Sequence, residues 1–131
     1  MAIAAVHVEA ANSDATDWAQ IVALYDMLRR VDASPVVALN RAVALGMRDG
    51  PDVGLAAVEA VLGQGSLDDY YLAHAALADM QRRVGLTEAA RTSYQRALKL
   101  TRQPAERRFL QSRLNQLGEE GGDRQRGLAA L

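Results

Sequence analysis

The chain has 131 residues, of which 50% are apolar and 24% are charged, the composition of one ordinary globular domain. It contains no cysteine, which excludes disulfides, thiolate metal sites and a cysteine nucleophile and fits a reducing cytoplasm. No apolar run approaches the roughly 18 residues of a membrane span, and no signal-peptide pattern is present, so we expect a soluble cytoplasmic protein without membrane contact.

Helix-start and helix-stop residues punctuate the chain. Asp17 precedes a 3-4-3 apolar spacing, Pro35 and Pro51 each follow a capping residue, Gly85 ends a helix and Pro104 begins another. The expected helices are 2–12, 17–31, 35–48, 51–63, 70–84, 87–100 and 104–117. No stretch alternates with period two for long enough to predict a strand, so the sequence predicts an all-α chain.

The two ends of the chain differ from its middle. Residues 2–12 are alanine-rich and share an apolar face, but no capping residue precedes Ala2, so we expect a fragment of a longer chain. Residues 118–131 are glycine-rich and polar, which predicts a flexible tail after a folded domain of residues 1–117.

An internal repeat organises the expected helices. GLTEAARTSYQRALKL (85–100) has the spacing of the second helix of a tetratricopeptide unit, and 70–84 would be its partner. Steps of 34 residues back from Gly85 reach Pro51 and then Asp17, both at helix starts. We therefore expect a tetratricopeptide-like right-handed stack of about three helix hairpins plus a C-terminal capping helix, with a generic helical bundle as the alternative.

Polar residues recur at one level of this expected stack. Counting by 33 or 34 from His7 reaches Asn40 or Arg41 and then His74, all on helices that would line the concave face. In one interpretation these side chains bond to one another, to backbone carbonyls or to carboxylates. In the other, Arg41 faces the groove and receives an anionic or carbonyl-rich peptide. The groove candidates are His7, Asn40, Arg41, Arg48, His74 and Arg82.

Charge is distributed unevenly around a net value of −1. Residues 1–79 carry four arginines and eleven acidic residues, whereas 80–113 carry nine basic residues and two acidic ones. The basic segment is either a set of solvated helix faces or a surface that docks on an acidic partner or near upstream DNA. The candidates for this basic surface are Arg83, Arg91, Arg96, Arg107 and Arg108.

Catalytic motifs are missing from the sequence. His7-Val8-Glu9 superficially resembles a deaminase fragment, but no cysteine pair completes a zinc site. No phosphate-binding glycine loop and no G-x-S-x-G motif is present. We therefore expect a noncatalytic domain without a metal ion or cofactor.

Four segments carry a resemblance to a known family: DWAQIVALYDMLRRVDASPVVALNRAVAL (17–45), DGP (49–51), YYLAHAALADMQRRVG (70–85) and AERRFLQSRLNQL (105–117). Together they resemble the C-terminal extension of a group of bacterial extracytoplasmic-function sigma factors, over roughly residues 2–117. The resemblance implies a tetratricopeptide-like fold and a regulatory role in transcription initiation through protein contacts. The implied partners are the sigma core of the parent chain, RNA polymerase or a separate regulator.

The resemblance also limits the expected function. The promoter-binding regions of the family are missing from this sequence, so we expect no direct binding of promoter DNA by this fragment. The alternative function is a ligand-sensing helical repeat domain that binds a small molecule or peptide in its concave groove.

Overall fold

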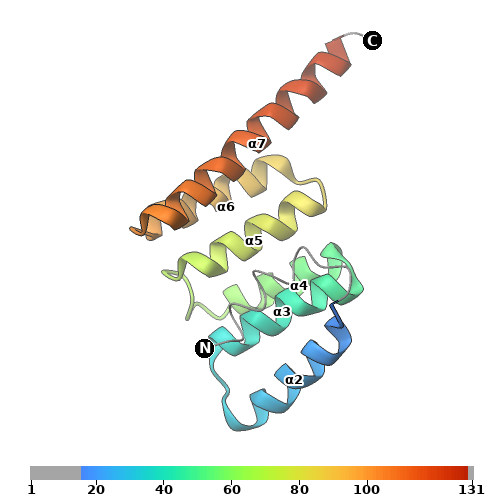
Figure 1. Ribbon diagram of the computed structural model, residues 1–131, viewed down its shortest axis with the longest axis vertical. Coiled ribbons are helices and arrows are strands. Elements are labelled where there is room, and N and C mark those ends of the chain that lie inside the picture. Colours follow the sequence, from blue (N-terminus) through green and yellow to red (C-terminus); the bar gives the residue numbers. More distant parts are fainter. Residues whose placement is uncertain (1–15, 130–131) are drawn as a thin grey trace. The chain divides into compact units, whose positions relative to one another are not determined.

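The computed structural model describes residues 16–129, with side chains up to Gly118, and its described part contains helices and no strand. The predicted all-α, helical-repeat-like class is confirmed. The helices are α2 (Trp18–Val31), α3 (Pro35–Asp49), α4 (Pro51–Leu62), α5 (Tyr71–Arg83), α6 (Thr87–Leu100) and α7 (Pro104–Ala129), shown in Figure 1. The chain divides into two compact units between Leu67 and Asp68, with α2 to α4 in the first and α5 to α7 in the second. None of the described helices is both long and apolar enough to cross a membrane.

The helices of the first unit begin at the residues that the sequence marks. The Asp17 carboxylate accepts a hydrogen bond from the backbone N–H of Gln20 at 3.1 Å, and so caps α2. Ser34 caps α3 in the same way by accepting from the N–H of Val36 at 3.2 Å. Gly50, with a φ of 113°, turns the chain between α3 and α4, so the two helices are separated by a single residue.

The turn between α5 and α6 is built around Gly85, which has a φ of 91°. The N–H of Leu86 donates to the carbonyl of Gln81 at 2.8 Å, and that of Gly85 donates to Arg82 at 3.1 Å. These two bonds form a Schellman motif, which satisfies the last carbonyls of α5. Leu86 holds the N-cap position of the next helix, and Thr87 is the first residue of α6.

In the first unit, α3 packs against both α2 and α4. Val22 and Tyr25 of α2 lie buried against Val37 and Ala44 of α3. Burial raises the pKa of Tyr25 to about 12. The remaining face of α2 exposes three apolar side chains, Leu24, Met27 and Val31. The helix predicted over 2–12, which would be the partner of α2 in a first hairpin, lies outside the described residues.

In the second unit, α6 packs against both α5 and α7. Ala78 of α5 and Ala90 and Ala97 of α6 are fully buried in the core of this unit. Such small side chains allow helix axes to approach closely. Tyr94 joins Leu110 and Leu117 of α7 in the same core.

The last helix extends beyond its predicted end. We expected α7 to end at Leu117 before a flexible tail, but helical backbone continues to Ala129, and Figure 1 shows it running back along α6 and on past the N-terminal start of that helix. The glycines of this segment lower helix propensity by about 1 kcal/mol each.

Candidate functional site

The arginines of the first unit predicted to line a groove have carboxylate partners. Arg41 donates from Nε to Oδ1 of Asp26 at 2.5 Å, which joins α3 to α2. The Arg41 side chain is 27% exposed and that of Asp26 is 48% exposed. Arg48 donates to the adjacent Asp49 at 2.7 Å and 2.9 Å. This hydrogen-bonded pairing raises the pKa of Arg48 and lowers that of Asp49.

The groove candidates of the second unit also have intramolecular partners. Nε2 of His74 lies 2.7 Å from the backbone oxygen of Asp68, as a donor would. Arg82 donates to Asp79 at 2.6 Å. The Tyr94 hydroxyl makes no hydrogen bond of standard geometry within the described residues, although the Arg82 guanidinium is near enough to act on it. Burial raises the pKa of Tyr94, and the guanidinium opposes that rise.

The structure therefore describes only part of the predicted level of polar residues, which comprises His7, Asn40 or Arg41, and His74. His7 lies outside the described residues, the half-buried Asn40 and Arg41 belong to the first unit, and His74 belongs to the second. The partners of Arg41 and His74 are a carboxylate and a backbone carbonyl, which agrees with the first of the two interpretations. That these side chains lie at one level of three neighbouring helices, and that a partner binds there, stay predictions.

The basic side chains that the structure describes in the second unit fall into two classes, and those of the first class have acidic neighbours within the chain. Asp79 pairs with both Arg82, at 2.6 Å, and Arg83, at 3.0 Å. Glu88 pairs with Arg91 at 3.4 Å, and Asp69 lies 3.8 Å from Arg96. Three of the five predicted basic-surface residues, Arg83, Arg91 and Arg96, thus have acidic neighbours.

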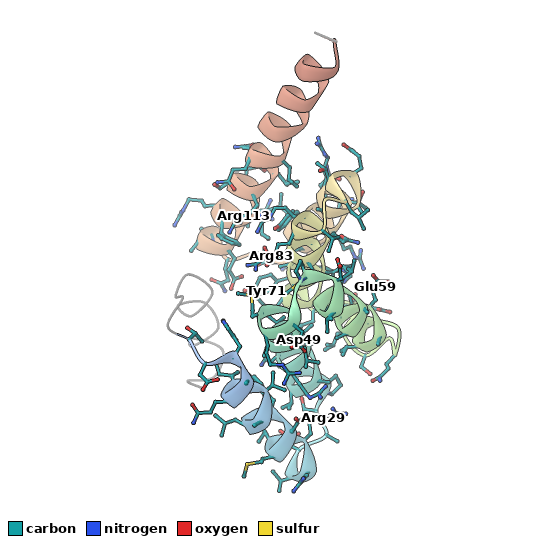
Figure 2. The ribbon with its side chains drawn as sticks, turned by 90° about the vertical axis from the view of Figure 1, so that its right-hand side faces the viewer. Arg29, Asp49, Glu59, Tyr71, Arg83 and Arg113 are labelled. Carbon is teal, nitrogen blue, oxygen red and sulfur yellow. The ribbon has the colours of Figure 1, made fainter. Side chains whose placement is uncertain are left out.

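The second class consists of cations that pair with no carboxylate among the described residues. We call this set the basic end: Lys99, Arg102, Arg107, Arg108 and Arg113. Between residues 99 and 113 the sequence has one acidic side chain, Glu106, and it is hydrogen-bonded to Thr101. Positive charge is therefore concentrated where α6 ends and α7 begins. Figure 2 labels Arg113, a member of the basic end, and Arg83, a paired cation on α5.

Arg107, one member of the basic end, stabilises the fold through hydrogen bonds to the backbone. Nη1 of Arg107 donates to the carbonyl of Leu98 at 2.8 Å and to that of Thr101 at 3.0 Å. These carbonyls lie at the C-terminus of α6, where the helix dipole favours a cation. Arg107 also lines an open hollow of about 420 Å³ together with Gln95, Leu98 and Lys99.

A second feature of this region is an exposed aromatic ring beside a cation. Phe109 is 55% exposed. The guanidinium carbon of the half-buried Arg113 lies 5.2 Å from the centre of its ring, and Nη1 of Arg113 donates to Oε1 of Gln116 at 3.2 Å. Stacking of this kind orients a guanidinium without neutralising it.

Polar contacts fix the first turn of α7 against the rest of the second unit. The Thr101 hydroxyl donates to the Glu106 carboxylate, and Tyr71 of α5 bonds to the same group. These two hydrogen bonds hold the pKa of Glu106 below its usual value of 4.5. The pKa of Tyr71 is raised, mainly by burial and then by the bond to Glu106. The start of α7 is therefore held by both α5 and the α6–α7 linker.

Sequence reasoning missed Lys99, Arg102 and Arg113 as surface candidates. A simple spacing rule separates part of the set, because Asp79 and Glu88 stand three or four residues before Arg82, Arg83 and Arg91 on their helices. When the cations with such a local partner are set aside, most of the remaining basic residues of the segment 80–113 lie between positions 99 and 113. The Asp69–Arg96 contact has no such local signal.

Comparison with known proteins found one informative relative. The chain is 40% identical over 119 residues to the "Uncharacterized protein R00370" of Rhizobium meliloti (strain 1021). The match covers 91% of this chain and 28% of the relative, so the chain spans little more than a quarter of that protein's length. No family model and no solved structure matches the chain.

Proposed function

We propose that this chain is a noncatalytic protein-interaction domain of a bacterial sigma factor, and that it acts in transcription initiation through its basic end. The proposal takes the sigma-factor context from the resemblance of residues 17–45, 70–85 and 105–117. The surface is inferred from one structural observation, the five cations near the start of α7 that have no carboxylate partner among the described side chains. Uncompensated charge of one sign attracts a partner of the other sign.

The polymerase and the remainder of a longer parent protein are the two partners to test. The tagged chain is immobilised and offered purified core RNA polymerase or, separately, the part of the Rhizobium relative outside the matched residues. We expect one of the two to be retained. Retention should weaken between about 0.05 M and 0.3 M salt, because exposed charges are screened over that range.

Two matched triple variants identify the surface used. The first replaces Lys99, Arg102 and Arg108 with glutamine, and the second makes the same change at Arg83, Arg91 and Arg96. Both remove three positive charges from the second unit. At roughly 0.5 kcal/mol for each exposed charge, the first should weaken binding about tenfold. The second should weaken it much less, because each of its arginines already has an acidic neighbour.

Two results would overturn the proposal. If neither polymerase nor the remainder of the relative is retained, the proposal that the chain belongs to a sigma factor is refuted. Equal weakening by the two triple variants would show that net charge, rather than the basic end, governs binding. Arg107 is left unchanged throughout because it caps carbonyls of α6 and its loss would disturb the fold.

A further inference from the structure

The Arg113 guanidinium is held in place by two neutral side chains, and it pairs with no carboxylate in the part of the chain whose side chains are described. The Phe109 ring lies 5.2 Å from its central carbon, and Gln116 accepts one of its N–H groups at 3.2 Å. Both neighbours are neutral. Arginine offers five N–H donors in a planar fork that matches a carboxylate. Because Arg113 is already oriented, less conformational entropy is lost when a carboxylate binds than at a free arginine.

Phe109 supplies an apolar contact next to this fork. It precedes Leu110, which is 1% exposed and faces the core, so the Phe109 ring lies on the flank of α7 and remains 55% exposed. Aromatic side chains and arginine are the residue types most enriched at the energetic centres of protein interfaces. An aromatic ring under an oriented guanidinium therefore suits a partner that offers an apolar side chain close to an acidic one.

The surrounding charges favour an acidic protein over a nucleic acid. Arg108 is the residue before Phe109, and Arg102 lies in the short linker before α7, so neighbouring cations favour an anion. A nucleic-acid domain is usually strongly basic overall. This chain has a net charge of −1 and a pI near 6.1.

We infer that Phe109 and Arg113 form the centre of a docking site for an acidic, leucine-containing segment of a partner protein. One carboxylate of that segment binds the Arg113 fork, and an apolar side chain packs on the exposed part of Phe109. The other cations of the basic end attract the acidic segment without setting its position. This inference rests on the proposed function for the partner's identity, but the chemistry of recognition can be tested without the polymerase.

The test uses a fluorescein-labelled amphipathic peptide of glutamate and leucine as the probe, and its fluorescence anisotropy is measured against the whole chain. A second peptide has glutamine in place of every glutamate, and a third has alanine in place of every leucine. Single-stranded and double-stranded DNA of about 20 nucleotides are the remaining probes. We expect the glutamate–leucine peptide to bind more tightly than each of the other four.

Single-residue variants then locate the site. Arg113→Gln should weaken binding of the glutamate–leucine peptide about tenfold, the usual size for a lost charge-assisted hydrogen bond. Phe109→Ala should weaken it severalfold, and both variants should keep the helical circular dichroism of the parent because neither residue is in the core. Arg83→Gln, a paired cation on α5, is the control and should change affinity less than twofold.

Several outcomes would contradict the inference: no binding of the glutamate–leucine peptide, equal binding of the glutamine peptide, tighter binding of DNA, or no effect of Arg113→Gln and Phe109→Ala. If the peptide test fails while polymerase or the remainder of the relative is still retained, only the Phe109–Arg113 site is refuted. If the peptide binds as expected while neither protein is retained, the sigma-factor context is refuted and the site stands.

Discussion

The pair formed by Arg41 and Asp26 gives a direct test of what Arg41 does. The 2.5 Å contact joins α3 to α2, with the arginine 27% exposed and the aspartate 48% exposed. Fully exposed ion pairs usually contribute between about 0.2 and 1 kcal/mol. Because Asp26 is about half exposed to solvent and Arg41 is less exposed, we expect a coupling free energy near the upper end of that range, about 1 kcal/mol.

A double-mutant cycle measures this coupling. Arg41→Gln, Asp26→Asn and the double variant are unfolded in urea, which preserves charge interactions. Trp18 is the chain's one tryptophan and packs at the edge of the same core cluster, so its fluorescence reports on the first unit. Arg29→Gln, at an exposed position on α2, removes the same charge and serves as the control. Added salt should reduce the coupling.

Two results would contradict the interpretation that Arg41 stabilises the fold by pairing with Asp26. A coupling free energy near zero would mean that the contact does not hold α2 to α3. An increase in stability on Arg41→Gln would mean that the guanidinium is kept at a cost, as binding residues often are. In that case a binding role for Arg41 would be favoured over a structural one.

Three further predictions concern the second unit. Gly85→Ala should lower the free energy of unfolding by about 1 to 2 kcal/mol because φ is 91°, whereas Gly118→Ala in α7 should raise it by about 0.5 to 1 kcal/mol, both measured by urea denaturation. The lowered pKa of Glu106 means that its stabilising effect is present above pH 4.5 and is lost as the pH falls through the folded-state pKa. Glu106→Gln should therefore flatten the acid limb of a stability–pH profile, and an unchanged limb would refute this role. Leu110→Ala should cost about 2 to 5 kcal/mol because the side chain is 1% exposed, and a cost below 1 kcal/mol would contradict its place in the core.

Much of the fold could be predicted because its signals are local. Pro35, Pro51 and Pro104 each begin a helix, and Gly85 ends one, since each residue restricts or frees the backbone at its own position. The end of α7 was predicted less well, because glycines weigh against a helix without forbidding it. Propensity differences of about 1 kcal/mol leave such an end open to other interactions.

The candidate site was harder to predict because it depends on which charges are already satisfied. The charge excess of residues 80–113 was visible in the sequence. Periodicity could have set aside Arg91, which follows Glu88 by three residues, but nothing local pairs Arg41 with Asp26 fifteen positions away. The position of Phe109 on the flank of α7 follows from the packing of Leu110 and Leu117 in the core of the unit.

The buried alanines of α5 and α6 restrict which substitutions this helix hairpin can accept. Ala78, Ala90 and Ala97 are completely enclosed, so a substitution there can add volume and can hardly remove any. Each added methylene would wedge the two helices apart and shift α7, which rests on α6. Substitutions are therefore better tolerated on the outer faces of these helices, and variants of α7 should keep these three alanines.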